Sequence, residues 1–205
     1  MVTHTFVNID LEEAAYLADL TGVEYDLRST IELCDELKEL IEASDYRGSR
    51  IDTLSTTISV RYSRSFGSGV RKKINIENIG SINEKLLEEH ERILAIRNKH
   101  IAHSVNAFEE NQVVGYYVLE NPEEKGIRSI SVQHGRVVGL SYSDADSIIQ
   151  LSKLALEYVK SEIEKEKSKI LKLVRQKDVN EFIYNASDRV PMIGKKDPRK
   201  KRKRK

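Results

Sequence analysis

The chain has 205 residues, of which 39% are hydrophobic and 33% are charged, with three prolines and a single cysteine. This composition is typical of a soluble, helix-rich protein, and no apolar run approaches the roughly 20 residues of a membrane span. Residues 1–20 carry four acids and lack a basic leader, so no secretion signal is expected. Because Cys34 has no second cysteine to pair with, we expect a reducing, cytoplasmic location.

Charge is concentrated near the end of the sequence, where Lys195–Lys205 holds nine basic residues and one acid. Within a total of +1, this local +8 leaves −7 for residues 1–194. We therefore predict an acidic folded body at 1–190 and a disordered basic tail at 191–205. The tail resembles a nuclear-import signal in composition, but we favour non-specific contact with nucleic acid or ribosomes.

Four segments before residue 106 place apolar residues at helical spacing. The first is short, from Asp10 to Leu20, and Thr21-Gly22 is expected to end it. Gly67-Ser68-Gly69 is expected to interrupt regular structure and to open a basic loop. The predicted helices cover residues 10–20, 24–43, 49–66 and 84–105, with Ser81 or Asn83 as the cap of the last.

The pattern changes after Glu110, where β-branched and aromatic residues alternate with turn signals. This predicts a hairpin of two or three strands inserted at about 112–141. Ser143 is expected to cap a further long helix, which residues 170–184 continue or repeat. The predicted fold is mainly α: an up-and-down helical bundle over residues 1–190, with a small β-hairpin insertion and the basic tail.

One stretch of the fourth predicted helix places charged and titratable groups on its apolar stripe. In an ideal α-helix, Arg97 projects near the middle of that stripe, two turns beyond His90. His100 lies roughly 60° from Arg97 and His103 roughly 120° away. Because an unpaired buried guanidinium is costly, Arg97 is expected to have a specific partner or to line a wet cleft. The plainer alternative is that Arg97 pairs with a carboxylate such as Glu91 and that the histidines lie on the surface.

An arginine and a histidine together suit phosphoryl transfer on RNA without a metal. A neutral imidazole can take the proton of a ribose 2′-hydroxyl or protonate the leaving oxygen. A guanidinium can hold the phosphate in a forked grip and stabilise the charge that builds on its oxygens. The two roles are complementary.

The stretch Arg97-Asn98-Lys99-His100-Ile101-Ala102-His103 resembles the signature of the HEPN superfamily. That signature is an arginine, commonly followed by a polar residue, then four to six residues before a histidine near the end of a bundle helix. Arg97, Asn98 and His103 match it. The upstream segment Arg61–Arg71 is similar to one in abortive-infection-type HEPN proteins of bacteria, and the resemblance covers roughly residues 24–159, interrupted by the hairpin.

The resemblance implies a homodimer in which two copies of the motif face one cleft. Many HEPN proteins are metal-independent endoribonucleases of toxin–antitoxin, abortive-infection and CRISPR systems, whereas others only bind RNA or serve as interaction modules. The alternative function expected for this chain is therefore a non-catalytic helical module that binds RNA or a protein and dimerises through the motif helix.

The resemblance implies that Arg97 and His103 act in catalysis and that Asn98 positions Arg97 or the phosphate. His100 remains the alternative histidine, because in an ideal helix it lies nearer to Arg97 than His103 does. The resemblance also implies an antitoxin or other regulatory partner. One HEPN subgroup, whose toxin is modified by a nucleotidyltransferase antitoxin, has a tyrosine two positions after the motif histidine. Here that position is Val105, which argues against this mode of regulation.

A second group of basic residues lies upstream and suits RNA phosphates. Its members are Arg61, Arg64, Arg71, Lys72 and Lys73. They could equally pair with the acidic residues Glu32, Asp35, Glu36 and Glu39 of the second predicted helix. Two further expectations concern the hairpin, which would flank the cleft entrance, and Cys34, which would be a core residue. No metal, cofactor or membrane partner is predicted, since clustered metal ligands are lacking; this also disfavours a metal-dependent deaminase or hydrolase.

Overall fold

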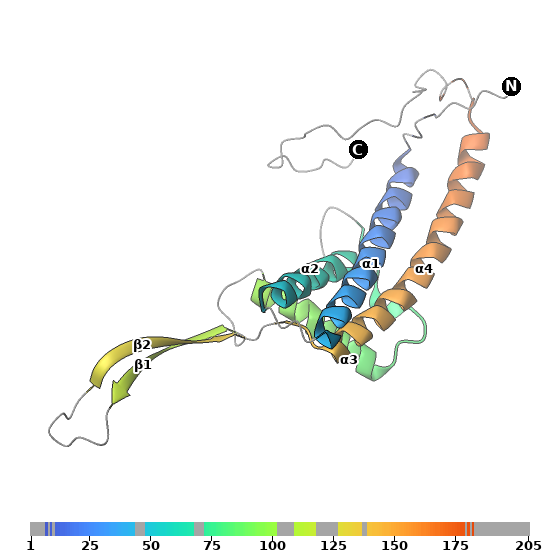
Figure 1. The fold of residues 1–205 in the computed structure, drawn as a ribbon. Helices are drawn as coiled ribbons and strands as arrows, with labels where there is room; N and C mark the ends of the chain where they lie inside the picture. The colour runs from blue at the N-terminus through green and yellow to red at the C-terminus, as the bar shows by residue number, and fades with distance from the viewer. Residues whose placement is uncertain are drawn as a thin grey trace. The chain divides into compact units, whose positions relative to one another are not determined.

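The computed structural model describes residues 7, 9, 11–43, 48–67, 72–101, 109–117, 127–136, 139–178, 180 and 182. The predicted tail at 191–205 and the predicted cap Asp10 lie outside these residues. In the described part, the chain is mainly helical and carries one small antiparallel hairpin, as predicted (Figure 1). The α-helices are α1 (Glu12–Glu42), α2 (Gly48–Phe66), α3 (Glu84–Ala95) and α4 (Tyr142–Arg175), and the strands are β1 (Glu109–Tyr117) and β2 (Ile127–Arg136).

The described residues belong to two compact units. Unit 1 takes its residues from 1–29, 64–81 and 152–205, and unit 2 takes its residues from 30–63 and 82–151. The helices α1 and α4 contribute residues to both. The division of the chain into one domain at 1–190 and a tail stays a prediction, as does the up-and-down order of a HEPN-like bundle.

The helix α1 is continuous through Thr21-Gly22, so the predicted break there is wrong. A glycine inside a helix costs about 1 kcal/mol relative to alanine. Leu20 and Val23 on either side are fully buried in unit 1, and their burial offsets that cost. The Thr21 hydroxyl donates to the Ala18 carbonyl at 2.9 Å instead of ending the helix.

The helix α4 begins with a capping box at Ser141 and Asp144. The Ser141 backbone amide donates to the Asp144 carboxylate at 2.7 Å, and the Asp144 amide donates to the Ser141 hydroxyl at 3.2 Å. The predicted cap Ser143 is therefore wrong by two residues. The helix then continues through the charged region to Arg175. Within the described residues, no helix is both long enough and apolar enough to cross a membrane.

The core of unit 2 joins α2 to α3 through a buried polar pair. Ile58 and Tyr62 of α2 are fully buried at the spacing the sequence predicts, and Ile93 of α3 is fully buried as well. The Tyr62 hydroxyl and His90 Nδ1 are 2.8 Å apart and share a hydrogen bond. Asn83 caps α3, because its side chain accepts from the Leu86 amide at 2.9 Å. The prediction of Asn83 as one of two possible caps is confirmed.

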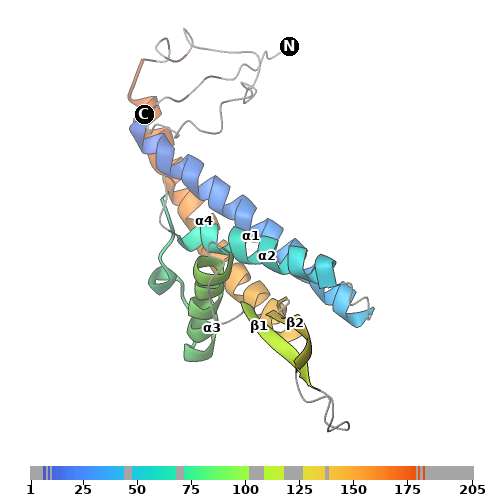
Figure 2. The ribbon, with the colours of Figure 1, turned by 90° about the vertical axis from the view of Figure 1, so that its left-hand side faces the viewer.

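The strands β1 and β2 pair side by side in an antiparallel ladder from Glu109 opposite Arg136 to Tyr117 opposite Ile127 (Figures 1 and 2). The predicted insertion is confirmed as two strands, but the pairing starts three residues earlier than expected. Leu140 is not in the ladder. It is buried in unit 2, and its amide donates to the Ser55 hydroxyl at 2.8 Å. Gly139 precedes it with φ +93°, where a side chain would be strained and would strike Ile51.

Candidate functional site

The helix that carries the motif changes its geometry at the motif itself. The α-helical part of α3 ends at Ala95, and Ile96–Ile101 forms a π-helical turn. At the junction, the Ile96 amide donates to the carbonyls of both Arg92 and Ile93. The uninterrupted α-helix predicted through residue 105 is therefore wrong at Ile96–Ile101, and residues 102–105 of that prediction lie outside the described residues. The ideal angle between Arg97 and His100 does not apply in the π-helical turn. Single π-helical turns are rare in proteins overall, and those that occur are often found at functional sites.

Arg97 is exposed, which corrects its expected place on a buried stripe. The stripe is real as far as Ile93, since Leu86, His90 and Ile93 are all less than 6% exposed. It excludes Leu87, which is 39% exposed. The last buried residue before Arg97 is thus Ile93, one turn earlier, and Arg97 itself is exposed to water. This is the favourable arrangement, because a guanidinium stays charged and is costly to remove from water.

Asn98 is the neighbour that orients Arg97. Arg97 Nη1 donates to Asn98 Oδ1 at 2.8 Å, and both side chains are exposed. Among the residues that the structure describes, no carboxylate pairs with Arg97, so the predicted alternative partner Glu91 is wrong. A guanidinium has five N–H donors. The contact with Asn98 uses one of them, and no other described residue accepts from the Arg97 guanidinium, so its remaining donors can bind a phosphate.

The histidines of the motif are not placed beside Arg97 by the structure. His100 lies in the π-helical turn, but its side chain is outside the described part of the chain. His103 lies outside it altogether. The choice between the two histidines, and the distance of either from Arg97, stay predictions.

A third histidine, His90, is well defined and was not predicted to take part in any contact. It is 5% exposed, and burial lowers the pKa of its imidazole to about 4. Burial also raises the pKa of Tyr62, so the hydroxyl stays protonated and can donate to His90 Nδ1. The two rings meet edge to face at 5.7 Å between centroids. His90 is therefore a neutral core residue of unit 2.

The predicted RNA-binding residues are divided between the units. Arg61 lies in unit 2 with Arg97; it is half-buried and has an interaction partner. Arg64, Lys72 and Lys73 lie in unit 1, and Arg71 is outside the described residues. Arg64 Nε is 3.4 Å from Asp26 Oδ2, with half of the Arg64 side chain exposed and only 3% of the Asp26 side chain. Arg64 thus pairs with an acid of α1, although not with one of the four acids that the sequence pointed to.

Lys72 has a structural role in unit 1. Its amide donates to the Asp19 carboxylate at 2.8 Å, and its ammonium lies 4.6 Å from the centre of the Tyr16 ring. Burial, followed by the nearby Tyr158 and two acids of α4, raises the pKa of Tyr16. A pocket of about 360 Å³ here also contains Glu12, Glu13 and Glu166. Because acids outnumber lysines in it, this pocket is a poor place for a phosphate.

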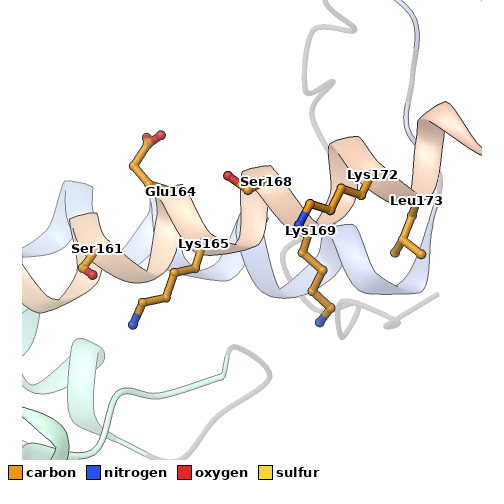
Figure 3. A pocket seen from close by; sticks show the side chains of 7 residues that line it. All are labelled: Ser161, Glu164, Lys165, Ser168, Lys169, Lys172 and Leu173. Atoms are coloured by element: carbon orange, nitrogen blue, oxygen red, sulfur yellow. The ribbon is translucent and has the colours of Figure 1, made fainter.

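A more basic hollow, of about 770 Å³, lies along α4 in unit 1 and was not predicted. Three lysines at i, i+4 and i+7 line it together with two serines; the full lining is Ser161, Glu164, Lys165, Ser168, Lys169, Lys172 and Leu173 (Figure 3). Lys165 pairs with Glu162 at 2.7 Å and Lys169 with Glu166 at 3.4 Å. Such exposed pairs contribute little and exchange readily for another anion. The spacing of the three lysines can be read from the sequence, but the neighbouring glutamates make the segment look like an ordinary surface helix of mixed charge.

Cys34 is a core residue of unit 2, as predicted. It is fully buried, and burial, with a smaller contribution from Asp35, raises the pKa of its thiol to about 12. It is therefore protonated at neutral pH. No group of three histidine, cysteine, aspartate or glutamate residues suited to a metal ion is found within the part of the chain that the structure describes.

Neither of the two hollows contains a motif residue, so the candidate catalytic geometry consists of Arg97, Asn98 and the π-helical turn that carries them. Comparison of the chain with models of protein families, with curated proteins and with solved structures finds no match in any of the three.

Proposed function

We propose that this protein is a metal-independent endoribonuclease that cleaves RNA at Arg97 and a histidine of the same motif. The observation that supports it best is the exposed Arg97 guanidinium, oriented by Asn98 and unpaired with any described carboxylate. Its position in a π-helical turn adds support, because such turns accompany functional sites. The sequence resemblance to HEPN ribonucleases gives the reaction class.

In the proposed reaction, the 2′-oxygen of a ribose attacks the adjacent phosphorus. The O2′–P bond forms and the P–O5′ bond breaks, so the products end in a 2′,3′-cyclic phosphate and a 5′-hydroxyl. His103, or His100 in its place, takes the 2′-hydroxyl proton while water protonates the leaving 5′-oxygen, or it protonates the leaving oxygen while water accepts the 2′-hydroxyl proton. Arg97 stabilises the charge on the non-bridging oxygens, and Asn98 holds Arg97 for that contact.

The further RNA contacts in this proposal come from exposed cations of unit 1. Lys73, the exposed half of Arg64 and the three lysines of the α4 hollow offer contacts to phosphates. A homodimer that brings two motifs to one cleft, and a role in prokaryotic defence or a toxin–antitoxin system, follow from the resemblance. Both belong to the proposal.

The second candidate is a non-catalytic module that binds RNA or a protein partner. It is favoured by one specific observation, the exposed apolar face of the β1–β2 hairpin, which has no role in the cleavage chemistry. Under this alternative, Arg97 would contribute to RNA affinity but no RNA would be cut.

The test is cleavage of a mixed-sequence RNA by purified protein in the presence of EDTA. Wild type is expected to produce fragments with 2′,3′-cyclic phosphate ends. Arg97→Ala and His103→Ala are expected to lose activity by at least about 10²-fold, the typical effect of removing a group that stabilises the transition state. His100→Ala identifies which histidine acts.

Lys85→Ala is the matched control, because Lys85 is an exposed cation on the same helix and lies outside the motif. It is expected to keep wild-type activity. Equal cleavage by wild type, Arg97→Ala and His103→Ala would remove the site assignment. Tight RNA binding without cleavage by the wild type would favour the second candidate.

A further inference from the structure

One face of the β1–β2 hairpin is apolar and exposed. The ladder places Val113 opposite Val132, Gly115 opposite Ile130 and Tyr117 opposite Ile127. Side chains of paired residues point to the same side of a sheet, and every second residue shares that side. One face of the hairpin therefore carries Val113, Tyr117, Ile127, Ile130 and Val132, with exposed fractions of 72%, 53%, 67%, 73% and 46%.

Gly115 and Ile127 show that this face is continuous. The ladder is irregular between Tyr116 and Tyr117, which sets Ile127 opposite Tyr117 and on the same side as Gly115. The Ile127 side chain covers Gly115, since a Cβ added there would lie 3.0 Å from Ile127 Cγ2. The glycine thus leaves no gap between Val113 and Tyr117. The opposite face is more polar and carries Gln112, Ser129, Ser131 and Gln133, together with Val114 and Tyr116.

A two-stranded hairpin of this kind does not stabilise itself. Isolated hairpins are at best marginally stable in water, and independent stability needs a hydrophobic face that is packed against something. Contiguous exposed apolar patches on soluble proteins mark interaction sites. The five large side chains therefore indicate that this face packs against a binding partner in the functional state of the protein.

Charge favours a protein surface over RNA as the cover. Residues 109–136 contain five acids and three basic residues, a net charge of −2. Nucleic-acid interfaces are strongly positive and use phosphate contacts to bind. The five apolar side chains of this face carry no charge and cannot make those contacts.

The available area fits a second copy of the same face. Burying one large apolar side chain removes roughly 100 Å² from water, so the five offer on the order of 500 Å² per chain. Two copies would bury on the order of 1,000 Å², which is the lower bound for a specific interface. Two sheets that pack through like apolar faces at about 10 Å form a sandwich, in which every inward side chain gains neighbours.

We propose that two copies of this chain associate through the apolar faces of their β1–β2 hairpins, which form a four-stranded sandwich. The interface is isologous, since each copy contributes the same residues. Because its area is small, the dimer has moderate affinity and its population depends on concentration. The inference does not rest on the ribonuclease proposal, so Arg97→Ala is expected to leave the dimer intact.

The first experiment is sedimentation velocity of the full chain between about 1 and 100 µM. Wild type is expected to shift from monomer to dimer across this range. Ile130→Lys places a charge in the middle of the face and is expected to weaken the dimer at least about 10²-fold. Ser131→Lys, one residue along on the other face, is the matched control and is expected to behave as wild type.

The second experiment detects the contact between two hairpins by disulfide cross-linking of introduced cysteines. Cys34 is buried and is the chain's own single cysteine, so an introduced surface thiol can be followed separately. With diamide as oxidant, Val113→Cys is expected to form a disulfide-linked dimer, whereas Gln112→Cys on the other face is not. A wild type that stays monomeric at 100 µM, a dimer that survives Ile130→Lys, or equal cross-linking of both cysteines would each overturn the proposal.

Discussion

His90 and Arg97 lie two turns apart on one helical stripe, yet the chain treats them in opposite ways. His90 is 5% exposed, neutral and bonded to the Tyr62 hydroxyl at 2.8 Å. Arg97 is exposed, and its one described hydrogen bond is to the adjacent Asn98. An imidazole can lose its proton and be buried in the neutral form, whereas a guanidinium stays charged and is costly to bury.

Stability and the proposed function therefore depend on different parts of this helix. Up to Ile93, the buried polar pair of Tyr62 and His90 contributes to the packing of α2 against α3. Beyond it, the helix changes to the π form and presents a charge that no described acid neutralises. We therefore expect changes at His90 and Tyr62 to alter folding and changes at Arg97 to alter activity. The following predictions test that separation.

The largest effect expected is on the pH dependence of stability. The pKa of His90 is lowered from about 6.5 when unfolded to about 4 when folded. Between these values the unfolded chain binds more protons at His90, so the contribution of His90 to stability is constant above pH 6.5 and falls as the pH drops toward 4. The total loss is about 3 kcal/mol, at 1.36 kcal/mol per pH unit.

The measurement is urea unfolding of wild type and His90→Gln at several pH values. Because carboxylates also titrate at low pH, the difference between the two proteins isolates His90. We expect the difference to shrink in step with the pH from 6.5 to 4. Two parallel curves would mean that His90 titrates normally and is not a neutral core residue.

A smaller effect is expected from Tyr62→Phe. The substitution keeps the ring and its edge-to-face contact with His90 but removes the hydroxyl, so His90 Nδ1 loses this hydrogen bond. The expected cost is about 1 to 2 kcal/mol in unfolding free energy. RNA cleavage by the folded variant at 25 °C should match wild type, and a loss of activity without loss of stability would link this pair to the catalytic site.

The smallest effect on stability is expected from Arg97→Ala. An exposed residue away from caps and cores changes the unfolding free energy by within about 0.5 kcal/mol. Thermal or urea unfolding measures it directly. A loss of several kcal/mol would mean that Arg97 has a structural partner, and the separation between the two halves of the stripe would fail.

The local sequence pattern predicted much of the fold. It predicted α2 with its buried Ile58 and Tyr62 from helical spacing, the Asn83 cap from the residue type before α3, and the hairpin from its β-branched and aromatic residues. It failed at Thr21-Gly22, where packing of Leu20 and Val23 outweighs the helix-breaking tendency of glycine. It also placed the cap at Ser143, although Ser141 and Asp144 have the spacing of a capping box and make its reciprocal side-chain-to-backbone bonds.

The candidate site was harder to predict than the fold. The sequence identified Arg97 and Asn98 but placed Arg97 in the interior, since an ideal helical wheel assumes that the stripe is covered along its whole length. The end of burial at Ile93 depends on neighbouring helices, and the π-helical turn depends on backbone hydrogen bonds that no side-chain pattern records. Tyr62 and His90 are 28 residues apart, so their bond leaves no local signal.

We propose that Arg97 acts on RNA while contributing almost nothing to folding. The most direct measurement is the single-turnover cleavage rate of RNA in EDTA for Arg97→Ala and Lys85→Ala, each shown by unfolding to be as stable as wild type. We predict a loss of at least about 10²-fold for Arg97→Ala and none for Lys85→Ala. Equal rates for the two variants would contradict the claim.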